Sequence, residues 1–493
     1  MAAISFAAAT AALGASPPPG SSLDALLAKS RAASGAPYRY HIRSRSREVH
    51  DGKSFDVTTE TEGLKYRAKS CLKDVCTGFY FDGERSYQAN FNDTALPLSS
   101  GVDGLELTLR AIASYAFSDP DFRKKGGTLV ERDAVLRNGT KYRRISVAPR
   151  LGALLDAVID PASGLVVGVI SDERKYAFEF SDQRKVGDKI TLPYAISLNG
   201  YTFTRYEERS IVATPLEAPA GIAPKLAAGD ASVKMRPSGV APQPVVPCTI
   251  GDQAAACLLD TGDSGLSMSL ELAEKLKIEP IPGSYDVHGV GQYVTGIVHA
   301  PPLRIGSAVF PSADYVVLHD LAQYGYDAIL GADFFAHAHV TLDFGTGEVH
   351  IAPSGDVAGG APIVFENFVP VISVGLNELE VPLQIDTGAD GTVDLSGDYY
   401  AAHPALFKAG PTISVRGIGG SGDAVSGTIS SVRLDGFELD RQRIVATKKL
   451  PLNGHVGSGL LQHFVVTFDY DHGLLGLVPR SGDASVKTAA ANR

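Results

Sequence analysis

The 493-residue chain has no tryptophan, three methionines and four cysteines. No segment reaches 18 consecutive apolar residues, the length that would predict a membrane-spanning helix. Positive charge is also scarce: the net charge is −10 and the isoelectric point is near 5.7, which argues against a nucleic-acid partner. With 44% hydrophobic and 20% charged residues, the chain is globular and long enough for two or three domains. Its 52 glycines and 29 prolines are typical of a turn-rich β protein.

Basic residues are absent before Lys29. The stretch 2–15 is an apolar, alanine-rich run with a small-x-small site at Ala12-Leu13-Gly14, and Pro17-Pro18-Pro19-Gly20 follows. We expect residues 1–20 to be a signal peptide and the protein to be exported, either periplasmic or secreted. Because the usual basic start is missing, a misassigned start or an alanine-rich tail is the alternative.

The four cysteines form two close pairs, Cys71 with Cys76 and Cys248 with Cys257. Cys-x4-Cys lacks the second ligand pair that a zinc site needs, so we expect no metal and no cofactor. We predict a local disulfide in each pair. For Cys248 and Cys257, two buried free thiols are the alternative.

The first half of the chain predicts a separate β-rich accessory domain, at residues 22–215. Many short runs in it alternate between apolar and polar residues, as half-buried strands do, and only 23–33 and 104–116 read as helices. Residues 216–240 are rich in Pro, Ala and Gly and predict a linker, which is also a place where processing would separate a propeptide. The last segment, 483–493, predicts a disordered tail.

The order of helices and strands in this accessory domain is similar to that of periplasmic lipoprotein-carrier half-barrels. That resemblance implies lipid or lipoprotein binding.

The strongest pattern is an apolar run that ends in Asp-Thr-Gly. It occurs twice, as Leu258-Leu259-Asp260-Thr261-Gly262 and as Gln384-Ile385-Asp386-Thr387-Gly388. A glycine that follows apolar residues lies 71 positions after each Asp, at Gly331 and Gly457. The spacings agree, so we expect one folding unit used twice, as lobes at 241–355 and 356–482.

This arrangement resembles the aspartic peptidases of the pepsin/retropepsin type. The lobes have about 115 to 125 residues, closer to a retropepsin subunit than to a pepsin lobe. The resemblance implies a mainly β fold: two retropepsin-like β-barrel lobes in tandem, related by a pseudo-twofold axis and pairing within a monomer. It implies that the catalytic residues Asp260 and Asp386 face each other over one water, supported by Thr261, Gly262, Thr387 and Gly388.

The implied activity is hydrolysis of peptide bonds by an aspartic endopeptidase. Two carboxylates about 3 Å apart share one proton. The charged member takes a proton from the water, which attacks the scissile carbonyl, and the neutral member donates to the developing oxyanion. The alternative is a catalytically inactive peptide- or lipoprotein-binding protein that keeps the peptidase fold.

Two apolar strands meet glycine-rich tips, at Tyr285–Gly291 and Ile413–Gly420. They resemble retropepsin flaps, which close over a bound peptide, although ordinary exposed hairpins are the alternative. We list the candidate substrate-binding glycines of the tips as Gly289, Gly291, Gly417 and Gly419.

The residues after the two turns are further substrate-binding candidates. Asp390 completes the retropepsin pattern Asp-Thr-Gly-Ala-Asp, in which the last Asp binds substrate backbone, and Ser264 is a weaker match at the same place of the first lobe. Asp263 stands where the family has Ala or Ser. It adds a third carboxylate, which we expect either to raise the pKa of the pair or to reduce activity.

Overall fold

The computed structural model describes residues 22–50, 52–98, 104–137, 139–171, 176–199, 201–217, 229–236, 242–355, 357, 360–448, 450 and 452–489. The protein is mainly β, and its two C-terminal lobes are built from barrel-like sheets. The predicted signal peptide at 1–20 lies outside the described residues.

The chain forms two compact units, but their boundary differs from the predicted one. The N-terminal unit comprises Met1–Arg47, Thr59–Tyr66 and Asp103–Leu216; the second, two-lobed unit takes the remainder, including Arg67–Val102. The N-terminal unit is therefore not the continuous segment 22–215, because Glu48–Thr58 and Arg67–Val102 belong to the second unit. Contacts between residues far apart in the chain, which no local pattern reveals, place 67–98 with the lobes.

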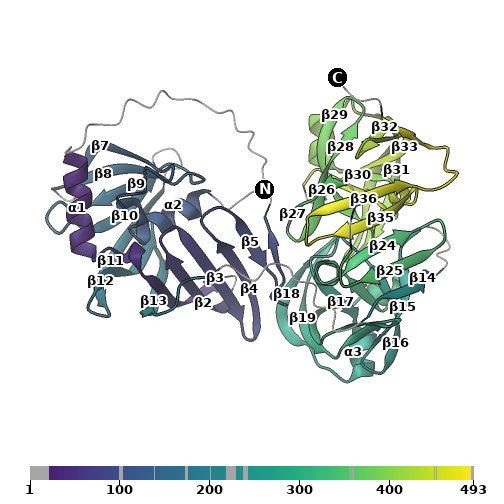
Figure 1. The fold of residues 1–493 in the computed structure, drawn as a ribbon, viewed down its shortest axis with the longest axis horizontal. Helices are drawn as coiled ribbons and strands as arrows, with labels where there is room; N and C mark the ends of the chain where they lie inside the picture. Colours follow the sequence, from purple (N-terminus) through teal and green to yellow (C-terminus); the bar gives the residue numbers. More distant parts are fainter. Residues whose placement is uncertain are drawn as a thin grey trace. The chain divides into compact units, whose positions relative to one another are not determined.

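An antiparallel sheet and two helices make up the N-terminal unit (Figure 1). The strand order is β1-β13-β12-β11-β10-β9-β8-β7, and apolar side chains of both helices share one core with the sheet. The helices agree with those predicted at 23–33 and 104–116. The bounds are α1 (Ser22–Ser34), α2 (Gly104–Ala113), β7 (Thr128–Arg137), β8 (Thr140–Ala148), β9 (Leu155–Ile159), β10 (Val166–Ser171), β11 (Tyr176–Val186), β12 (Ile190–Leu198) and β13 (Tyr201–Val212).

Strands β1 (His41–His50), β2 (Lys53–Glu62) and β3 (Lys65–Leu72) contribute residues to both units. The short strands β4 (Val75–Phe81), β5 (Ser86–Ala89) and β6 (Ala95–Pro97) belong to the two-lobed unit.

Lobe 1 is a nine-stranded sheet with the order β18-β19-β22-β17-β23-β16-β15-β20-β21. Its bounds are β15 (Val245–Ile250), β16 (Gln253–Leu259), β17 (Leu266–Ser269), α3 (Leu270–Leu276), β18 (Ile281–His288), β19 (Gln292–Ala300), β20 (Leu303–Ile305), β21 (Ala308–Phe310), β22 (Ala313–Leu318), the 3-10 helix η3 (Leu321–Tyr324), β23 (Ala328–Leu330), α4 (Ala332–Ala336), β24 (His339–Asp343) and β25 (Glu348–Ala352).

Lobe 2 follows the same order of main elements. Its bounds are β26 (Ala361–Pro362), β27 (Val364–Glu366), β28 (Val369–Leu376), β29 (Leu379–Asp386), β30 (Val393–Ser396), α5 (Gly397–Ala402), β31 (Lys408–Gly417), β32 (Gly420–Leu434), β33 (Phe437–Thr447), β34 (Gly454–Gly457), α6 (Ser458–Leu461), β35 (Phe464–Asp469) and β36 (Leu474–Pro479).

The same local chemistry starts a helix at matching places of the two lobes. The Ser269 hydroxyl accepts from the Leu272 amide at 3.1 Å, and the Ser396 hydroxyl accepts from the Tyr399 amide at 3.1 Å. Each serine satisfies an amide that the first helical turn leaves without a partner, which fixes where α3 and α5 begin.

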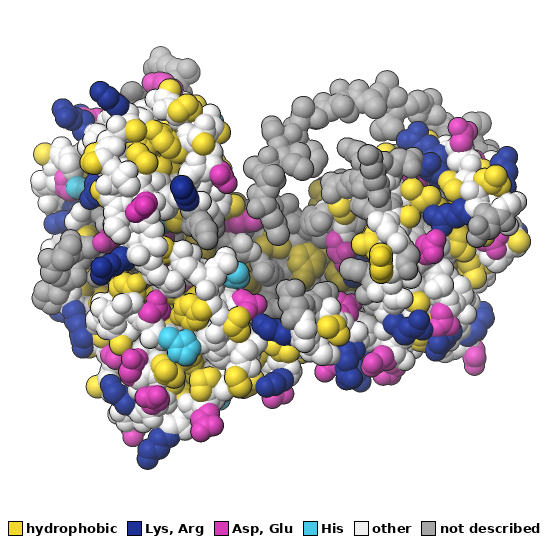
Figure 2. All heavy atoms as spheres, turned by 180° about the vertical axis from the view of Figure 1, so that it is seen from behind, with side chains coloured by type: hydrophobic (Ala, Val, Ile, Leu, Met, Phe, Trp, Pro, Cys, Tyr) yellow, Lys and Arg dark blue, Asp and Glu magenta, His cyan; other side chains and the backbone are white. Residues whose placement is uncertain are grey.

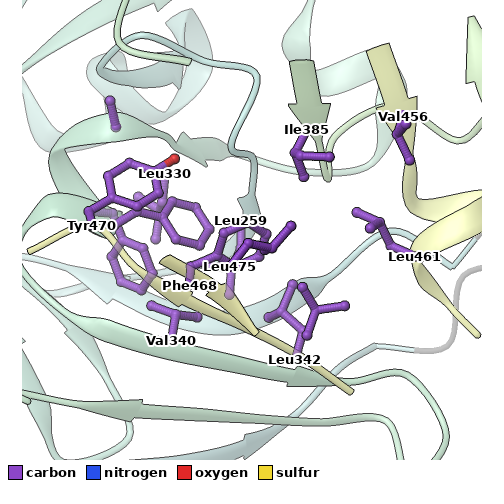
Figure 3. Packing of buried hydrophobic residues seen from close by; sticks show 14 of the residues in the cluster. Leu259, Leu330, Val340, Leu342, Ile385, Val456, Leu461, Phe468, Tyr470 and Leu475 are labelled. Carbon is purple, nitrogen blue, oxygen red and sulfur yellow. The ribbon is translucent and has the colours of Figure 1, made fainter. Parts of the chain in front are cut away.

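A six-stranded sheet joins the lobes, in the order β14-β25-β24-β35-β36-β26. At its centre β24 of lobe 1 pairs with β35 of lobe 2, with Val340 opposite Phe468. Figure 3 shows the buried side chains above this sheet, where Leu259 and Leu330 of lobe 1 share a cluster with residues of lobe 2 such as Leu475. This continuous core holds the two Asp-Thr-Gly turns on one rigid base.

Two segments that we predicted to be irregular contain strands. β14 (Ala231–Lys234), within the predicted linker 216–240, pairs with β25. β37 (Val486–Thr488), within the predicted disordered tail 483–493, pairs with β33. Both are short edge strands, so their pairing depends on the neighbouring strand rather than on a periodicity of their own.

On the face shown in Figure 2, the described Lys and Arg side chains are interspersed with Asp and Glu and form no single basic patch. Among the described residues, no helix combines the length and the apolar character needed to cross a bilayer.

Candidate active site

The two Asp-Thr-Gly turns begin where β16 and β29 end. β16 runs parallel to β23, and the Asp260 amide donates to the Leu330 carbonyl at 3.0 Å. β29 runs parallel to β34 in the same way, with Asp386 opposite Gly457. A side chain at Gly331 would come within 2.3 Å of the Asp263 carbonyl, so the close approach of this strand to the turn requires glycine.

The two threonines interlock across the pair of lobes. The Thr261 amide donates to the Thr387 hydroxyl at 3.0 Å, and the Thr387 amide donates to the Thr261 hydroxyl at 3.1 Å. Each hydroxyl in turn donates, at 2.7 Å, to a carbonyl of the opposite strand, Ile385 or Leu259. Both threonines are fully buried, so these bonds fix the separation of the turns.

The glycines after the threonines bring backbone amides to the carboxyl groups. The amides of Gly262 and Gly388 both donate to Asp260 Oδ1, at 2.8 and 3.2 Å, the second across the lobe interface. A Cβ at Gly388 would lie 2.2 Å from Asp260 Oδ2, and one at Gly262 would lie 2.5 Å from the Asp386 carboxyl carbon. Only glycine at both places lets the carboxyl groups approach each other.

The electrostatics of the pair are those of two carboxyl groups that compete for one proton. Burial, the charge of Asp386, the charge of Asp263 and a hydrogen bond that the protonated Asp260 donates to Asp386 raise the pKa of Asp260 well above its usual range. Two adjacent buried carboxylates cannot both ionise readily, so the pair retains one proton at mildly acidic pH.

The predicted third carboxylate, Asp263, turns back onto its own loop. It accepts from the Gly265 amide at 2.9 Å and from the Ser267 hydroxyl at 2.7 Å, and burial raises its pKa. Its lone pairs are used within the turn, and its influence on Asp260 is that of a nearby charge. The raised pKa of Asp260 is the first of the two effects that we expected of this third carboxylate, and its role in substrate binding stays a prediction.

The two other candidates after the turns differ in their surroundings. Asp390 of lobe 2 is exposed. The Ser264 hydroxyl of lobe 1 lies 3.4 Å from the Tyr285 hydroxyl, and its carbonyl accepts from Asn90 at 3.3 Å.

The two glycine-rich tips meet each other. The hairpin β18–β19 touches the turn between β31 and β32, where the Gly291 amide donates to the Ile418 carbonyl at 3.2 Å. The lobe 2 tip is also held by residues around η3: the Gly419 amide donates to Asp320 at 2.9 Å, and the Tyr324 hydroxyl donates to the Gly417 carbonyl at 2.8 Å. All four predicted glycines are thus brought together, with Gly289 donating to Gly291 at 2.9 Å.

Sequence reasoning missed a loop between β5 and β6 that lies on lobe 1. Asn90 and Asn92 donate to the two oxygens of the buried Asp333 at 2.8 and 2.7 Å. Between them, the Phe91 ring lies edge-on to Tyr285, with centroids 5.8 Å apart, and near Gly265. Asp333 follows the bracing Gly331 by two residues, and a buried acid there was the one signal that a distant partner exists.

Sequence reasoning also missed His455. In lobe 2, β34 pairs His455 with Asp394 on one side and with Gln384 on the other. At the matching register of lobe 1, Ile329 pairs with Ser267 and Leu258. Comparing positions 329 and 455 in the aligned repeats would have found this polar substitution.

Both predicted cysteine pairs are disulfide-bonded. Cys248 and Cys257 lie on β15 and β16, the hairpin that leads into the first turn, and both are buried. Over the described ranges, no cluster of three or more His, Cys, Asp or Glu side chains is placed to hold a metal ion. The arrangement brings two interacting carboxyl groups together, and such a pair can share one proton.

Residues 246–334 match a family model described as aspartyl protease. The matched segment runs from β15 to α4, so it includes the first Asp-Thr-Gly turn and ends before the second. A comparison with curated proteins finds no match. Among solved structures, an outer membrane lipoprotein-sorting protein domain from Vibrio parahaemolyticus is similar at 10% identity and a TM-score of 0.28, over 39% of this chain and 93% of that chain.

Proposed function

We propose that this protein is an aspartic endopeptidase in which Asp260 and Asp386 activate one water molecule to hydrolyse a peptide bond. The observation that carries the proposal is the interlocked pair of Asp-Thr-Gly turns, in which the Gly388 amide, two residues after Asp386, donates across the lobe interface to Asp260 at 3.2 Å. The aspartyl protease match over 246–334 supports a peptidase-type hydrolase at the level of the family.

The chemistry follows from the unequal surroundings of the two acids. Asp260 keeps the shared proton because burial and two neighbouring charges raise its pKa. Asp386 then accepts a proton from the water as it attacks the scissile carbonyl. Asp260 donates its proton to the developing oxyanion, and no covalent intermediate forms. The flap tips close the site from above and exclude bulk water.

The substrate proposed is a peptide or an unfolded protein segment, bound between the turns and the flap tips. We propose that Gly289, Gly291, Gly417 and Gly419 present backbone groups to this segment, and that the exposed Asp390 accepts from its amides on the lobe 2 side. Ser264 is the weaker counterpart on the lobe 1 side, because Tyr285 and Asn90 already contact it.

Denatured casein tests the proposal. The full chain and the variants Asp260→Asn and Asp386→Asn are incubated with it between about pH 4 and 7, with and without a peptide that mimics the tetrahedral transition state. Each variant should lose about 10²- to 10⁴-fold in rate, since each removes one partner of the proton transfer. Asp252→Asn, an exposed residue of the β15–β16 turn, is the matched control and should cleave like wild type.

Equal rates in wild type and both site variants would overturn the proposal. If wild type leaves casein intact but binds the peptide, and both variants bind it equally, the inactive peptide-binding alternative is favoured.

A further inference from the structure

We propose that His455, held by Asp394, is a positioning residue that keeps the negative charge of the acid pair on Asp386 and sets the pH range in which the pair is singly protonated. The proposal rests on the proposed peptidase function for its effect on rate. The structural premise is the contact between His455 and Asp386. It lies within lobe 2 and can be tested without measuring activity.

The register of the sheet places the imidazole between two carboxyl groups. His455 lies on β34, between β29 and β30, and is paired directly with Asp394. Residues paired across neighbouring strands share a face, and so do residues two apart on one strand. His455 therefore shares a face with Gln384, its partner on β29, and with Asp386, two residues further on.

The distances agree with the register. His455 Nε2 lies 3.1 Å from Asp394 Oδ2, and Nδ1 lies 3.9 Å from Asp386 Oδ2. Each ring nitrogen thus faces one carboxylate, and with Nδ1 at 3.9 Å the contact to Asp386 is an ion pair rather than a hydrogen bond. Only 8% of His455 is exposed, so solvent screens these charges weakly.

The groups that face His455 favour its charged form. Burial acts to lower its pKa, but the hydrogen bond to Asp394 and the charges of Asp386, Asp394 and Asp390 outweigh it and raise the pKa to about 9. The ring is therefore an imidazolium at acidic and neutral pH. It provides a fixed positive charge next to Asp386.

Lobe 1 provides the opposite environment around Asp260. The residue at the register of His455 is the apolar Ile329, and its partner Ser267 donates to Asp263 at 2.7 Å. Asp263 raises the pKa of Asp260 by its negative charge. One lobe thus favours the neutral acid and the other favours the charged acid, which assigns the shared proton to Asp260.

The consequence for pH dependence has a definite sign. A positive charge near the pair stabilises every ionised form of it, so removing that charge makes both ionisations less favourable. Both limbs of the pH profile should then move to higher pH. From the Coulomb interaction of weakly screened charges about 4 Å apart, we expect a shift of about 1–3 pH units.

The first experiment measures kcat/KM for casein-derived peptides from pH 3 to 9. His455→Gln keeps a hydrogen-bond donor for Asp394 but removes the charge, and both limbs should move to higher pH. His463→Gln is the matched control, because His463 pairs with Asp483 at 2.8 Å in the same lobe without facing the acid pair. Thermal unfolding of each variant shows whether it is folded. A profile of folded His455→Gln that superimposes on wild type overturns the proposal.

If His455→Gln does not fold, the double variant His455→Ile with Asp394→Ser carries the test. It installs the residues of lobe 1, Ile329 and Ser267, and removes the buried pair together. We expect a shift in the same direction but smaller, because a negative charge leaves with the positive one. No shift in this folded variant overturns the proposal.

The second experiment follows the His455 ring by NMR in the full chain with 13C-labelled histidine, assigned by comparison with His455→Gln. Asp386→Asn should lower the pKa of His455 by about 1–3 units, because it removes the facing charge, and Asp260→Asn should change it by less than half as much. A pKa that is the same in Asp386→Asn and wild type overturns the proposal. If wild type cleaves nothing, the peptidase function fails while this titration still decides whether His455 and Asp386 are coupled.

Discussion

Lobe 1 and lobe 2 are alike where their turns meet and different in what surrounds each acid. The Thr261 and Thr387 bonds are nearly symmetrical, with corresponding distances that agree within 0.1 Å. Beside the acids, lobe 1 has Ile329 where lobe 2 has His455. A homodimer repeats each such substitution in both halves, whereas a single chain can place an acid beside one turn and a cation beside the other.

Lobe 1 also has two supports that lobe 2 lacks at the matching places. Its leading hairpin carries the Cys248–Cys257 disulfide, where the repeat offset places Val374 and Leu383 in lobe 2. Its Asp333 is held by the loop before β6, and the corresponding residue of lobe 2 is Gly459. Lobe 1 is therefore held by a cross-link within its sheet and by a loop from far along the chain, and each can be removed separately.

Removing the disulfide should have the largest effect. The double variant Cys248→Val with Cys257→Leu gives lobe 1 the apolar residues of lobe 2 and should lower the free energy of unfolding by roughly 2–3 kcal/mol, because the unfolded hairpin gains freedom. Denaturant unfolding without reductant measures it. Replacing Cys71 and Cys76 by serine is the control and should cost less, since that loop is shorter. An unchanged midpoint for the first variant would show that lobe 1 needs no cross-link.

Removing one amide from Asp333 should have an intermediate effect. Asn92→Ala leaves Asp333 Oδ2 without its 2.7 Å donor and should cost about 1–3 kcal/mol at neutral pH. Burial raises the pKa of Asp333, so the carboxyl group is charged only above that raised pKa. The cost should therefore shrink as pH falls through it, and denaturant unfolding at pH 4 and 7 measures this. Asn377→Ala in lobe 2, whose amide serves the Leu406 carbonyl, is the control and should cost the same at both pH values.

A cost for Asn92→Ala that does not vary with pH would mean that Asn92 acts through its two bonds with the Asp314 backbone, at 2.9 and 2.8 Å, rather than through Asp333.

Releasing the glycine-rich tip of lobe 2 should have the smallest effect. Tyr324→Phe removes the 2.8 Å bond to the Gly417 carbonyl, a neutral bond worth about 0.5–1.5 kcal/mol. We expect KM for a peptide substrate to rise about 2- to 10-fold with kcat little changed, because the tip contributes to binding rather than to proton transfer. Tyr400→Phe, stacked on Phe407 away from the tips, should leave both constants unchanged. A loss confined to kcat would instead assign Tyr324 to the chemical step.

The sequence predicted the mainly β fold and drew attention to the two turns, because an apolar strand that ends in Asp-Thr-Gly is a local pattern. It did not predict the unit to which residues 67–98 belong or the pairing of Asn92 with Asp333, since these contacts join residues more than 200 positions apart. It did not predict the bonds of Asp263 to the Gly265 amide and the Ser267 hydroxyl, because the direction of a side chain in a tight turn depends on which hydroxyl and amide lie nearby. It did not identify His455 as a site residue, because a single histidine within an apolar run belongs to no recognisable motif.

The bond between Asn90 and Asp333 joins residues 243 positions apart in the chain. At ribosomal rates of roughly 5–20 residues per second, Asp333 is synthesised about 12–50 seconds after Asn90. During that interval lobe 1 is incomplete, so the loop and the apolar ring of Phe91 cannot pack against it. Completion of lobe 1 therefore depends on an early segment that remains unpacked during translation. A chaperone that shields such segments should raise the yield of folded protein.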